Sequence, residues 1–414
     1  MAHSQTSNRV PALRFPQFQN DGEWECTALG AEMNYVNGVA HEKEINVSGK
    51  YIVVNSKFIS TEGQVEKRTD YPYCLAEKND ILMVLSDLPN GKALAKCFYV
   101  EESDKYTVNQ RICKLKSKRV SSKLLYYLIN RNPFFLSFDD GVKQTNLRKE
   151  DVLNCPLVIP KSPKEQSHIA ECLSLIDKMI AEYINKLELL KFHKKGLMQK
   201  LFPAKGQEKP ELRFKEFEKD GEWEEKKLGE LFDKVTRRNT ENYQNVLTIS
   251  AQYGLVSQYD YFNKNVAAHD ITNYYLIYKG DFAYNKSRSQ GYPYGAIKSL
   301  RLYDKGVVST LYICFRIKND ANSSIDFFEH YFETDLINDE IGKIAQEGAR
   351  NHGLLNISTD DFFNKVSVIV PSPSEQKKIA DCLSSIDNMI SCYTNELNLL
   401  EQHKKGLIQQ LFPK

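Results

Sequence analysis

The sequence lacks any pair of cysteines at Cys-x-x-Cys spacing, and its nine cysteines are scattered along 414 residues. This absence argues against a disulfide framework and against a cysteine-rich zinc site. Charge of one sign is also missing: 56 Lys and Arg stand against 54 Asp and Glu, so any nucleic-acid binding must depend on local patches. No run approaches the roughly 18 apolar residues of a membrane helix, and residues 1–10 lack the apolar stretch of a secretory signal. We therefore expect a cytoplasmic protein with no membrane partner.

Motifs for catalysis are missing as well. Each Gly-Lys pair is followed by Tyr, Ala or Ile instead of Ser or Thr, which excludes a Walker A loop. No Gly-x-Gly cofactor loop follows a predicted strand, and the eight histidines form no pair at metal-ligand spacing. The run from Asn132 to Phe135 is similar to the Asn-Pro-Pro-Tyr/Phe motif of amino-methyltransferases but lacks its second proline. We predict no catalytic residue, no metal and no cofactor bound by this chain.

What the sequence does contain is a duplication. Residues 11–30 read PALRFPQFQNDGEWECTALG and residues 210–229 read PELRFKEFEKDGEWEEKKLG, so both tryptophans of the chain lie in one repeated motif. A second repeat relates residues 163–203 to residues 373–413 at an offset of 210 positions. The stretches between the repeats show no comparable similarity to each other. The order constant, variable, constant therefore occurs twice, which predicts a pseudo-twofold chain.

The second repeat predicts two long helices, because its apolar residues recur with a period of 3.5. Each predicted helix begins at a Ser-Pro-x-Glu capping box and ends at Leu-Phe-Pro. A lysine, Lys194 or Lys404, interrupts each apolar seam at the same position. We expect the two helices to pair as an antiparallel coiled coil; the alternative is two unrelated surface helices, each packed on its own domain. The predicted seam comprises Ile169, Leu173, Ile176, Ile180, Leu187, Leu190, Ile379, Leu383, Ile386, Ile390, Leu397 and Leu400.

The variable stretches, residues 31–160 and 230–370, mix short β-rich runs with turns and brief helices, which predicts an α+β fold. The candidate strands are Lys50–Val54, Asp80–Leu85, Pro156–Pro160, Val246–Ile249, Gly306–Ile317 and Val366–Val370, and the candidate helices are Ser121–Ile129 and Ile325–Phe332. Loops rich in Lys, Arg, Asn and Gln carry the side chains that contact phosphates and base edges. Solvated loops of the same composition are equally common in proteins that bind no DNA. The candidate DNA-binding residues are Lys143, Gln144, Asn146, Arg148, Lys286, Arg288, Gln290, Arg350 and Asn351.

The duplicated motifs resemble those of a specificity (S) subunit of a type I restriction–modification system. They read Pro-x-Leu-Arg-Phe, Gly-Glu-Trp and Leu-Gly before each variable stretch, and Pro-x-x-Glu-Gln-x-x-Ile-Ala-x-Cys-Leu to Leu-Phe-Pro after it. The resemblance implies two globular α/β target recognition domains, each reading half of a bipartite site in double-stranded DNA. It also implies helices that set the spacing and dock two methyltransferase (M) subunits. Restriction/motor (R) subunits complete such complexes, and the partner subunits use S-adenosylmethionine, ATP and Mg²⁺.

The resemblance and the repeats together predict the domain borders. We expect a disordered N-terminus over residues 1–10, a first target recognition domain over 11–160, a spacer helix over 161–203 and a linker over 204–209. A second target recognition domain then occupies 210–370, and a second spacer helix 371–414. Two other functions stay open, a stand-alone DNA-modifying enzyme and a coiled-coil scaffold without a DNA role. The bases read and the length of the unread gap are not encoded in any recognisable motif.

Overall fold

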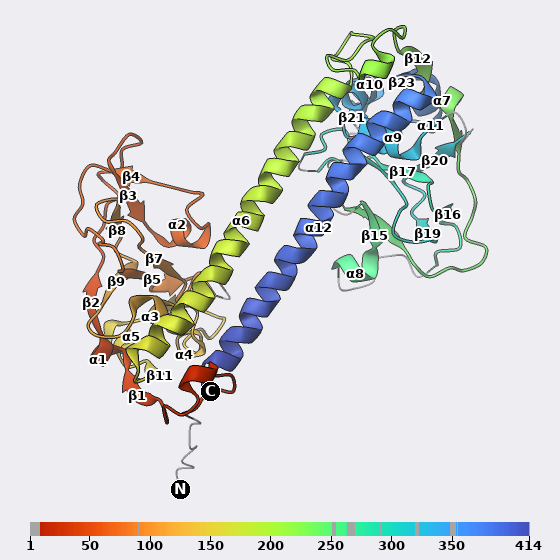
Figure 1. Ribbon diagram of the computed structural model, residues 1–414. Helices are drawn as coiled ribbons and strands as arrows, with labels where there is room; N and C mark the ends of the chain where they lie inside the picture. Colours follow the sequence, from red (N-terminus) through yellow and green to blue (C-terminus); the bar gives the residue numbers. More distant parts are fainter. Residues whose placement is uncertain are drawn as a thin grey trace. The chain divides into compact units, whose positions relative to one another are not determined.

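The computed structural model describes residues 9–89, 91–250, 254–262, 270–289, 291–318, 323–347, 353 and 355–413. The contacts divide the chain into two compact units. Unit 1 comprises Met1–Ile184 and Glu396–Lys414, and unit 2 comprises Asn185–Asn395. Two helices of 39 residues, α6 (Pro163–Leu201) and α12 (Pro373–Leu411), each contribute one half to each unit (Figure 1).

Unit 1 contains a globular part built around a 4-stranded sheet of order β2-β9-β5-β7. A second sheet has the order β4-β3-β8, and β1 pairs with β11 where the chain enters and leaves the globular part. The elements before α6 are η1 (Pro16–Phe18), β1 (Glu25–Ala28), α1 (Leu29–Glu32), β2 (Met33–Asn37), β3 (Tyr51–Val54), α2 (Ser56–Ser60), β4 (Arg68–Thr69), β5 (Ile81–Val84), β6 (Ser86–Asp87), β7 (Cys97–Tyr99), β8 (Tyr106–Val108), β9 (Ile112–Ser117), α3 (Ser122–Ile129), α4 (Pro133–Leu136), β10 (Thr145–Asn146), α5 (Lys149–Leu153) and β11 (Pro156–Ile159).

Unit 2 contains a globular part with a 4-stranded sheet of order β13-β20-β17-β18. Here β12 pairs with β23 at the entry and exit of the chain. The elements before α12 are η2 (Lys215–Phe217), β12 (Glu224–Lys227), α7 (Leu228–Leu231), β13 (Phe232–Lys234), β14 (Leu247–Ser250), β15 (Gly254–Ser257), α8 (Gln258–Phe262), β16 (Tyr275–Tyr278), β17 (Phe282–Asn285), β18 (Ala296–Ser299), β19 (Lys305–Val308), β20 (Ile313–Ile317), α9 (Ile325–Tyr331), α10 (Asp335–Ile344), β21 (Gln346–Glu347), β22 (Leu355–Asn356), α11 (Thr359–Lys365) and β23 (Ser367–Val370).

The two globular parts share one topology although their sequences show no comparable similarity. In both 4-stranded sheets, the first and second strands in chain order flank the last one, and a helix follows that last strand: α3 after β9 and α9 after β20. Each core joins the sheet, this helix and the first turns of a long helix, through Leu173 in unit 1 and Leu383 in unit 2. The α+β prediction is confirmed, and the duplication extends to the fold of the variable stretches.

Most candidate elements form as predicted, with one error in unit 2. The run Gly306–Ile317 is not one strand, because it splits into β19 and β20, which belong to different sheets. A turn separates them: the amide of Tyr312 donates to the carbonyl of Ser309 at 3.1 Å, and the Leu311 amide donates to the Ser309 hydroxyl at 3.3 Å. A serine that bonds the backbone two residues on favours a turn over a continuing strand.

The long helices run antiparallel within each unit. In unit 2, Lys186 Nζ lies 4.0 Å from the Tyr393 ring centroid and Lys194 Nζ lies 2.7 Å from the Asp387 carboxylate, so residue numbers rise along α6 as they fall along α12. In unit 1, Asp177 of α6 pairs with Lys404 of α12. Of the predicted seam, Ile169, Leu173, Ile176, Leu187, Ile379, Leu383 and Ile386 are buried, whereas Ile180, Leu190, Ile390, Leu397 and Leu400 are half-buried.

The repeated N-terminal motif anchors the start of each long helix. The Glu165 amide donates to the Ser162 hydroxyl at 3.5 Å, as the capping box predicts. A capping box also has a second hydrogen bond, here from the Ser162 amide to the Glu165 carboxylate. This bond does not form among the described residues, so the prediction of a complete box is wrong. The Glu165 carboxylate accepts hydrogen bonds from Arg14 at 2.7 and 2.8 Å and from Trp24 Nε1 at 3.2 Å, because these buried donors need an anion. Arg213 binds Glu375 in the same bidentate way, at 2.8 and 2.7 Å.

Replacing Arg14 with alanine is expected to destabilise unit 1 strongly. Only 7% of the Arg14 side chain and 1% of the Glu165 side chain are exposed, so the substitution leaves a buried carboxylate without its partner. Breaking a buried pair costs about 3–5 kcal/mol, which urea unfolding would measure. Lys105→Ala, which removes an exposed pair with Glu102, is the control and should cost less than about 1 kcal/mol. Equal losses in the two variants would contradict the anchoring role.

Candidate nucleic-acid interface

In unit 1, the candidate DNA-binding residues lie on and beside one short strand. Lys143, Gln144, Asn146 and Arg148 are all exposed, and they surround or belong to β10, just before α5. Gln144 Nε2 donates to Asn146 Oδ1 at 3.3 Å. Strand β10 pairs with β6, so Asn146 lies opposite Ser86. The structure thus brings all four candidates onto one solvent-exposed edge.

In unit 2, two candidate segments lie next to each other. The Arg288 amide donates to the Gly353 carbonyl at 2.8 Å, and the Leu355 amide donates to the Lys286 carbonyl at 3.1 Å. Arg288 is exposed, whereas Lys286 is half-buried and its ammonium donates to the Ile357 carbonyl at 3.3 Å. Desolvation by burial lowers the pKa of Lys286. The other three candidates, Gln290, Arg350 and Asn351, lie outside the described residues.

The two clusters occupy equivalent places in the shared topology. In unit 1 the segment after β5 pairs with the strand before α5, and in unit 2 the segment after β17 bonds the strand before α11. Sequence reasoning missed the unit 1 loop that follows β6, which carries the exposed Lys92. Asp87 shapes this loop, since its carboxylate accepts from the amides of Leu88 and Ala93 at 2.9 and 2.6 Å. This loop contains no recognisable motif. It becomes a candidate DNA-binding loop only because it occupies the same place in the topology of unit 1 as residues 286–289 occupy in unit 2.

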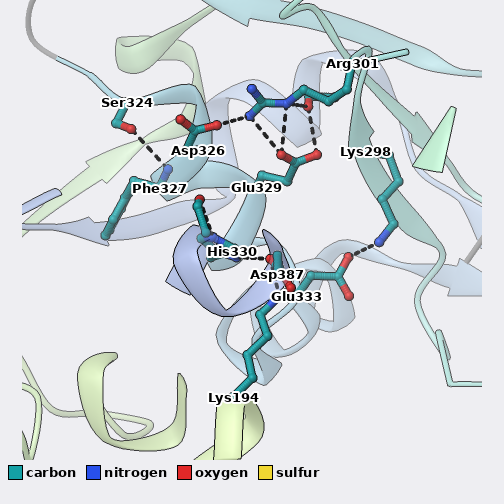
Figure 2. Close-up of polar contacts among 12 residues, drawn as sticks. Lys194, Lys298, Arg301, Ser324, Asp326, Phe327, Glu329, His330, Glu333 and Asp387 are labelled. Atoms are coloured by element: carbon teal, nitrogen blue, oxygen red, sulfur yellow. Dashed lines mark hydrogen bonds and ion pairs between the residues drawn. The ribbon is translucent and has the colours of Figure 1, made fainter. Parts of the chain in front are cut away.

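A polar cluster joins the globular part of unit 2 to its long helices (Figure 2). Lys194 of α6 donates to both carboxylate oxygens of Asp387 at 2.7 Å, and His330 of α9 lies beside them with Nδ1 3.9 Å from Asp387. His330 Nε2 lies 3.3 Å from the Ser384 hydroxyl. The lysine that interrupts the predicted seam therefore pairs with an aspartate on the other helix. Figure 2 also shows the far side of α9, where Arg301 pairs with Glu329 at 2.8 Å.

Unit 1 repeats this cluster with a tyrosine in place of the histidine. Lys404 pairs with Asp177, and the Tyr127 hydroxyl donates to Asp177 at 2.6 Å. Tyr127 and His330 occupy the same position, because each lies six residues after the serine that caps its helix. Burial and the neighbouring carboxylate raise the pKa of Tyr127, which keeps its hydroxyl a donor. The Lys–Asp pairs, which we call the helix pairs, are thus duplicated along with the sequence.

Replacing His330 with tyrosine is expected to make unit 2 less sensitive to acid. Burial, reinforced by the Lys194 ammonium, lowers the pKa of His330 to about 3. Below about pH 6.5 the unfolded state therefore binds a proton at this histidine, whereas the folded state does not bind it until the pH approaches 3. The wild type therefore loses stability as the pH falls from 6.5 toward 3, by at most about 1.4 kcal/mol per pH unit. Between pH 7 and pH 5.5, His330→Tyr should lose about 1 kcal/mol less than the wild type in urea unfolding. Equal losses would contradict this assignment.

Exposed apolar side chains lie at equivalent positions on the long helices of both units. Met179 and Leu399 are exposed in unit 1, and their counterparts at the 210-residue offset, Met389 and Leu189, are exposed in unit 2. Large apolar side chains that repeat on a solvent-facing surface mark an interaction site more often than isolated ones do. Both units therefore have a similar apolar surface on their long helices.

The two equivalent globular parts and the repeated helices agree with what is found when this sequence is compared with known protein families. The sequence profile of the type I restriction modification DNA specificity domain matches residues 22–190 and matches again at residues 220–402. The chain belongs to this family. Each match contains one variable stretch, so the two globular parts are the two target recognition domains of the family. The resemblance seen in the repeated motifs is confirmed.

Two relatives of the specificity family match almost the whole chain. The type I restriction enzyme MjaVIII specificity subunit of Methanocaldococcus jannaschii is 25% identical over 427 residues, which cover 96% of this chain and 93% of the relative. The crystal structure of the type I restriction-modification system S subunit from M. genitalium has a similar fold, with a TM-score of 0.59 at 18% identity. That alignment covers 98% of this chain and 99% of the other. Both likenesses extend across the two specificity domains.

The described residues contain neither a candidate metal site nor a candidate membrane helix. No group of three or more His, Cys, Asp or Glu within those residues is placed to hold a metal ion. Among the helices formed by the same residues, none is long and apolar enough to cross a membrane.

Proposed function

We propose that each target recognition domain reads one half of a bipartite site in double-stranded DNA, as the sequence-recognition part of a type I restriction–modification complex. The observation that carries this proposal is one fold used twice with different loops at the equivalent edge. A shared scaffold gives both domains the same docking geometry, and unlike loops give each domain its own base contacts. The unit 1 edge offers Lys143, Gln144, Asn146 and Arg148, and the unit 2 edge offers Lys286 and Arg288, with Gln290, Arg350 and Asn351 in the same stretches of sequence.

We further propose that the helical surfaces dock two M subunits, one on each unit. The equivalent exposed pairs, Met179 with Leu399 and Met389 with Leu189, support two similar sites, because a repeated surface binds repeated copies of one partner. R subunits would join through this assembly. The chain itself would be non-catalytic and cytoplasmic, and the bound partners would supply S-adenosylmethionine, ATP and Mg²⁺ for methylation, translocation and cleavage. The domain borders proposed are those predicted from the repeats.

Methylation mapping tests the proposed function. Cells that express this chain with its cognate M subunits should acquire genome-wide methylation at one bipartite sequence with a fixed unread gap. Cells that express the M subunits alone should lack it, because contacts to the phosphate backbone without base readout carry no sequence information. A purified chain that methylates or cleaves DNA without partners would favour the stand-alone enzyme. Failure of the complete complex to prefer any sequence would favour the scaffold.

A further inference from the structure

The 210-residue repeat begins earlier than the long helices, inside the two target recognition domains. It relates the segment from Asn146 to Asn154 with the segment from Asn356 to Asn364, across β10 and β22 and across α5 and α11. The identical positions of these segments are Asn146 and Asn356, Asp151 and Asp361, and Asn154 and Asn364, and the similar ones include Leu147 and Ile357. The similarity therefore reaches the edge that carries the candidate DNA-binding residues.

Most shared residues of this segment have structural roles. Leu147 and Ile357 are buried, with 4% and 3% exposed. The Asp151 carboxylate accepts from the Arg148 amide at 2.8 Å at the start of α5, and Asn154 ends this helix. Packing and capping account for the recurrence of such residues in two domains of one fold.

Asn146 and Asn356 have no such role. Both are exposed, and each is the second residue of a short strand, a position that asparagine does not favour intrinsically. The Asn146 side-chain oxygen accepts from Gln144, while no acceptor within the described part of the chain pairs with its Nδ2. The same exposed amide at the same place in both domains therefore requires an explanation outside the fold.

A side chain shared by both domains cannot discriminate between two different half-sites. It is suited to the part of DNA that is identical everywhere, the phosphodiester backbone, whose oxygens accept from amide N–H groups. Cationic residues flank both positions: Lys143 and Arg148 lie near Asn146 in sequence, and Lys286 donates to the carbonyl next to Asn356. We propose that Asn146 and Asn356 are phosphate-binding residues, one in each target recognition domain. Each side-chain amide donates to a phosphate of the DNA backbone and so positions the exposed edge of its domain at a DNA groove. This inference rests on the proposed DNA-reading function.

The test compares alanine and aspartate variants in the complete complex with M subunits. Each of Asn146→Ala and Asn356→Ala should weaken binding about fivefold, the worth of one hydrogen bond. The double variant should lose about 25-fold, because the two residues lie in different units and act independently. The losses should be equal on a duplex with the methylated sequence and on one without it. The methylated sequence itself should stay the same.

Replacing the asparagine with aspartate tests whether its side chain contacts a DNA phosphate or the edge of a base. Asn146→Asp should bind more weakly than Asn146→Ala at low salt, because a carboxylate repels a phosphate, and the difference should shrink as salt rises. Asn34→Asp is the matched control: Asn34 is an exposed asparagine on β2, which belongs to a different sheet from β10, and the same charge change there should be neutral. Gln144→Ala is the contrast, since this unshared neighbour should alter base preference in one half-site only.

Three outcomes would overturn the proposal that Asn146 and Asn356 bind phosphates. A changed methylation sequence in Asn146→Ala would make Asn146 a base reader. Weakened assembly with M subunits in the absence of DNA would make it a protein contact. Unchanged binding in the double variant would leave the shared asparagines without this role. Failure of the proposed function is separate, because a wild-type complex without sequence preference would show it before any variant is compared.

Discussion

Exchanging residues 31–160 for the same segment of a relative with a different target is expected to replace one half of the methylated sequence and leave the other half intact. The exchanged segment contains the whole 4-stranded sheet of unit 1 together with β10 and α5. The anchor residues Arg14 and Glu165 lie outside it, so the new domain meets the same support. Genome-wide methylation mapping would read the result, with the reciprocal exchange of residues 230–370 as the matched control.

The two exchanges should behave as mirror images. The first should change only one half-site and the second only the other, since no reading loop is shared between the segments. A change in both halves after either exchange would mean that the domains read DNA jointly. Loss of all methylation with intact assembly would mean that residues outside the exchanged segments contribute to base reading.

Lengthening both long helices by four residues is expected to widen the unread gap by one or two base pairs. Four residues add about 6 Å of helix, which corresponds to less than two steps of about 3.4 Å along duplex DNA. The insertions should follow Leu190 and Leu400, since Lys194 follows Asp177 by 17 positions and Lys404 follows Asp387 by 17 positions. Matched insertions keep these spacings equal, so both helix pairs can still form. Methylation mapping would measure the gap.

The half-site sequences should not change in this experiment, because no reading loop is altered. Insertion after Leu190 alone is the informative control. It leaves α12 with its original spacing between Asp387 and Lys404, so we expect lower activity from a complex whose helices differ in length. An unchanged gap with full activity in the matched variant would contradict the helices as the spacing element.

Local signals predicted much of this fold, because they depend on neighbouring residues. The capping serines, the period of 3.5 and the terminal Leu-Phe-Pro defined both long helices, and short apolar runs located β5, β11 and β23. The division of Gly306–Ile317 into two strands was not predicted, because the turn at Ser309 is marked by a hydrogen bond and not by a long polar segment. The role of Lys194 also depended on a residue far away in the sequence, Asp387.

The candidate site was predictable only in part. Loop composition selected Asn146 and Arg288, but composition does not say which loops share an edge. The pairing of β6 with β10, and the bond from Arg288 to Gly353, arise from long-range backbone contacts. Asn356 was missed although the 210-residue offset passes through it, because a single repeated asparagine between mostly different residues has little weight until its exposure is known.

The two tryptophans can serve as intrinsic fluorescent probes, one for each unit. Trp24 and Trp223 are both buried, one in each copy of the repeated N-terminal motif and one in each unit, and the chain has no third indole. Trp24 donates to the Glu165 carboxylate, whereas Trp223 Nε1 is buried with no hydrogen-bond partner within the described residues. Their fluorescence should therefore differ in emission wavelength. With one tryptophan replaced by phenylalanine, the remaining emission reports the opening of a single unit, so the two units can be followed separately while DNA or partner subunits bind.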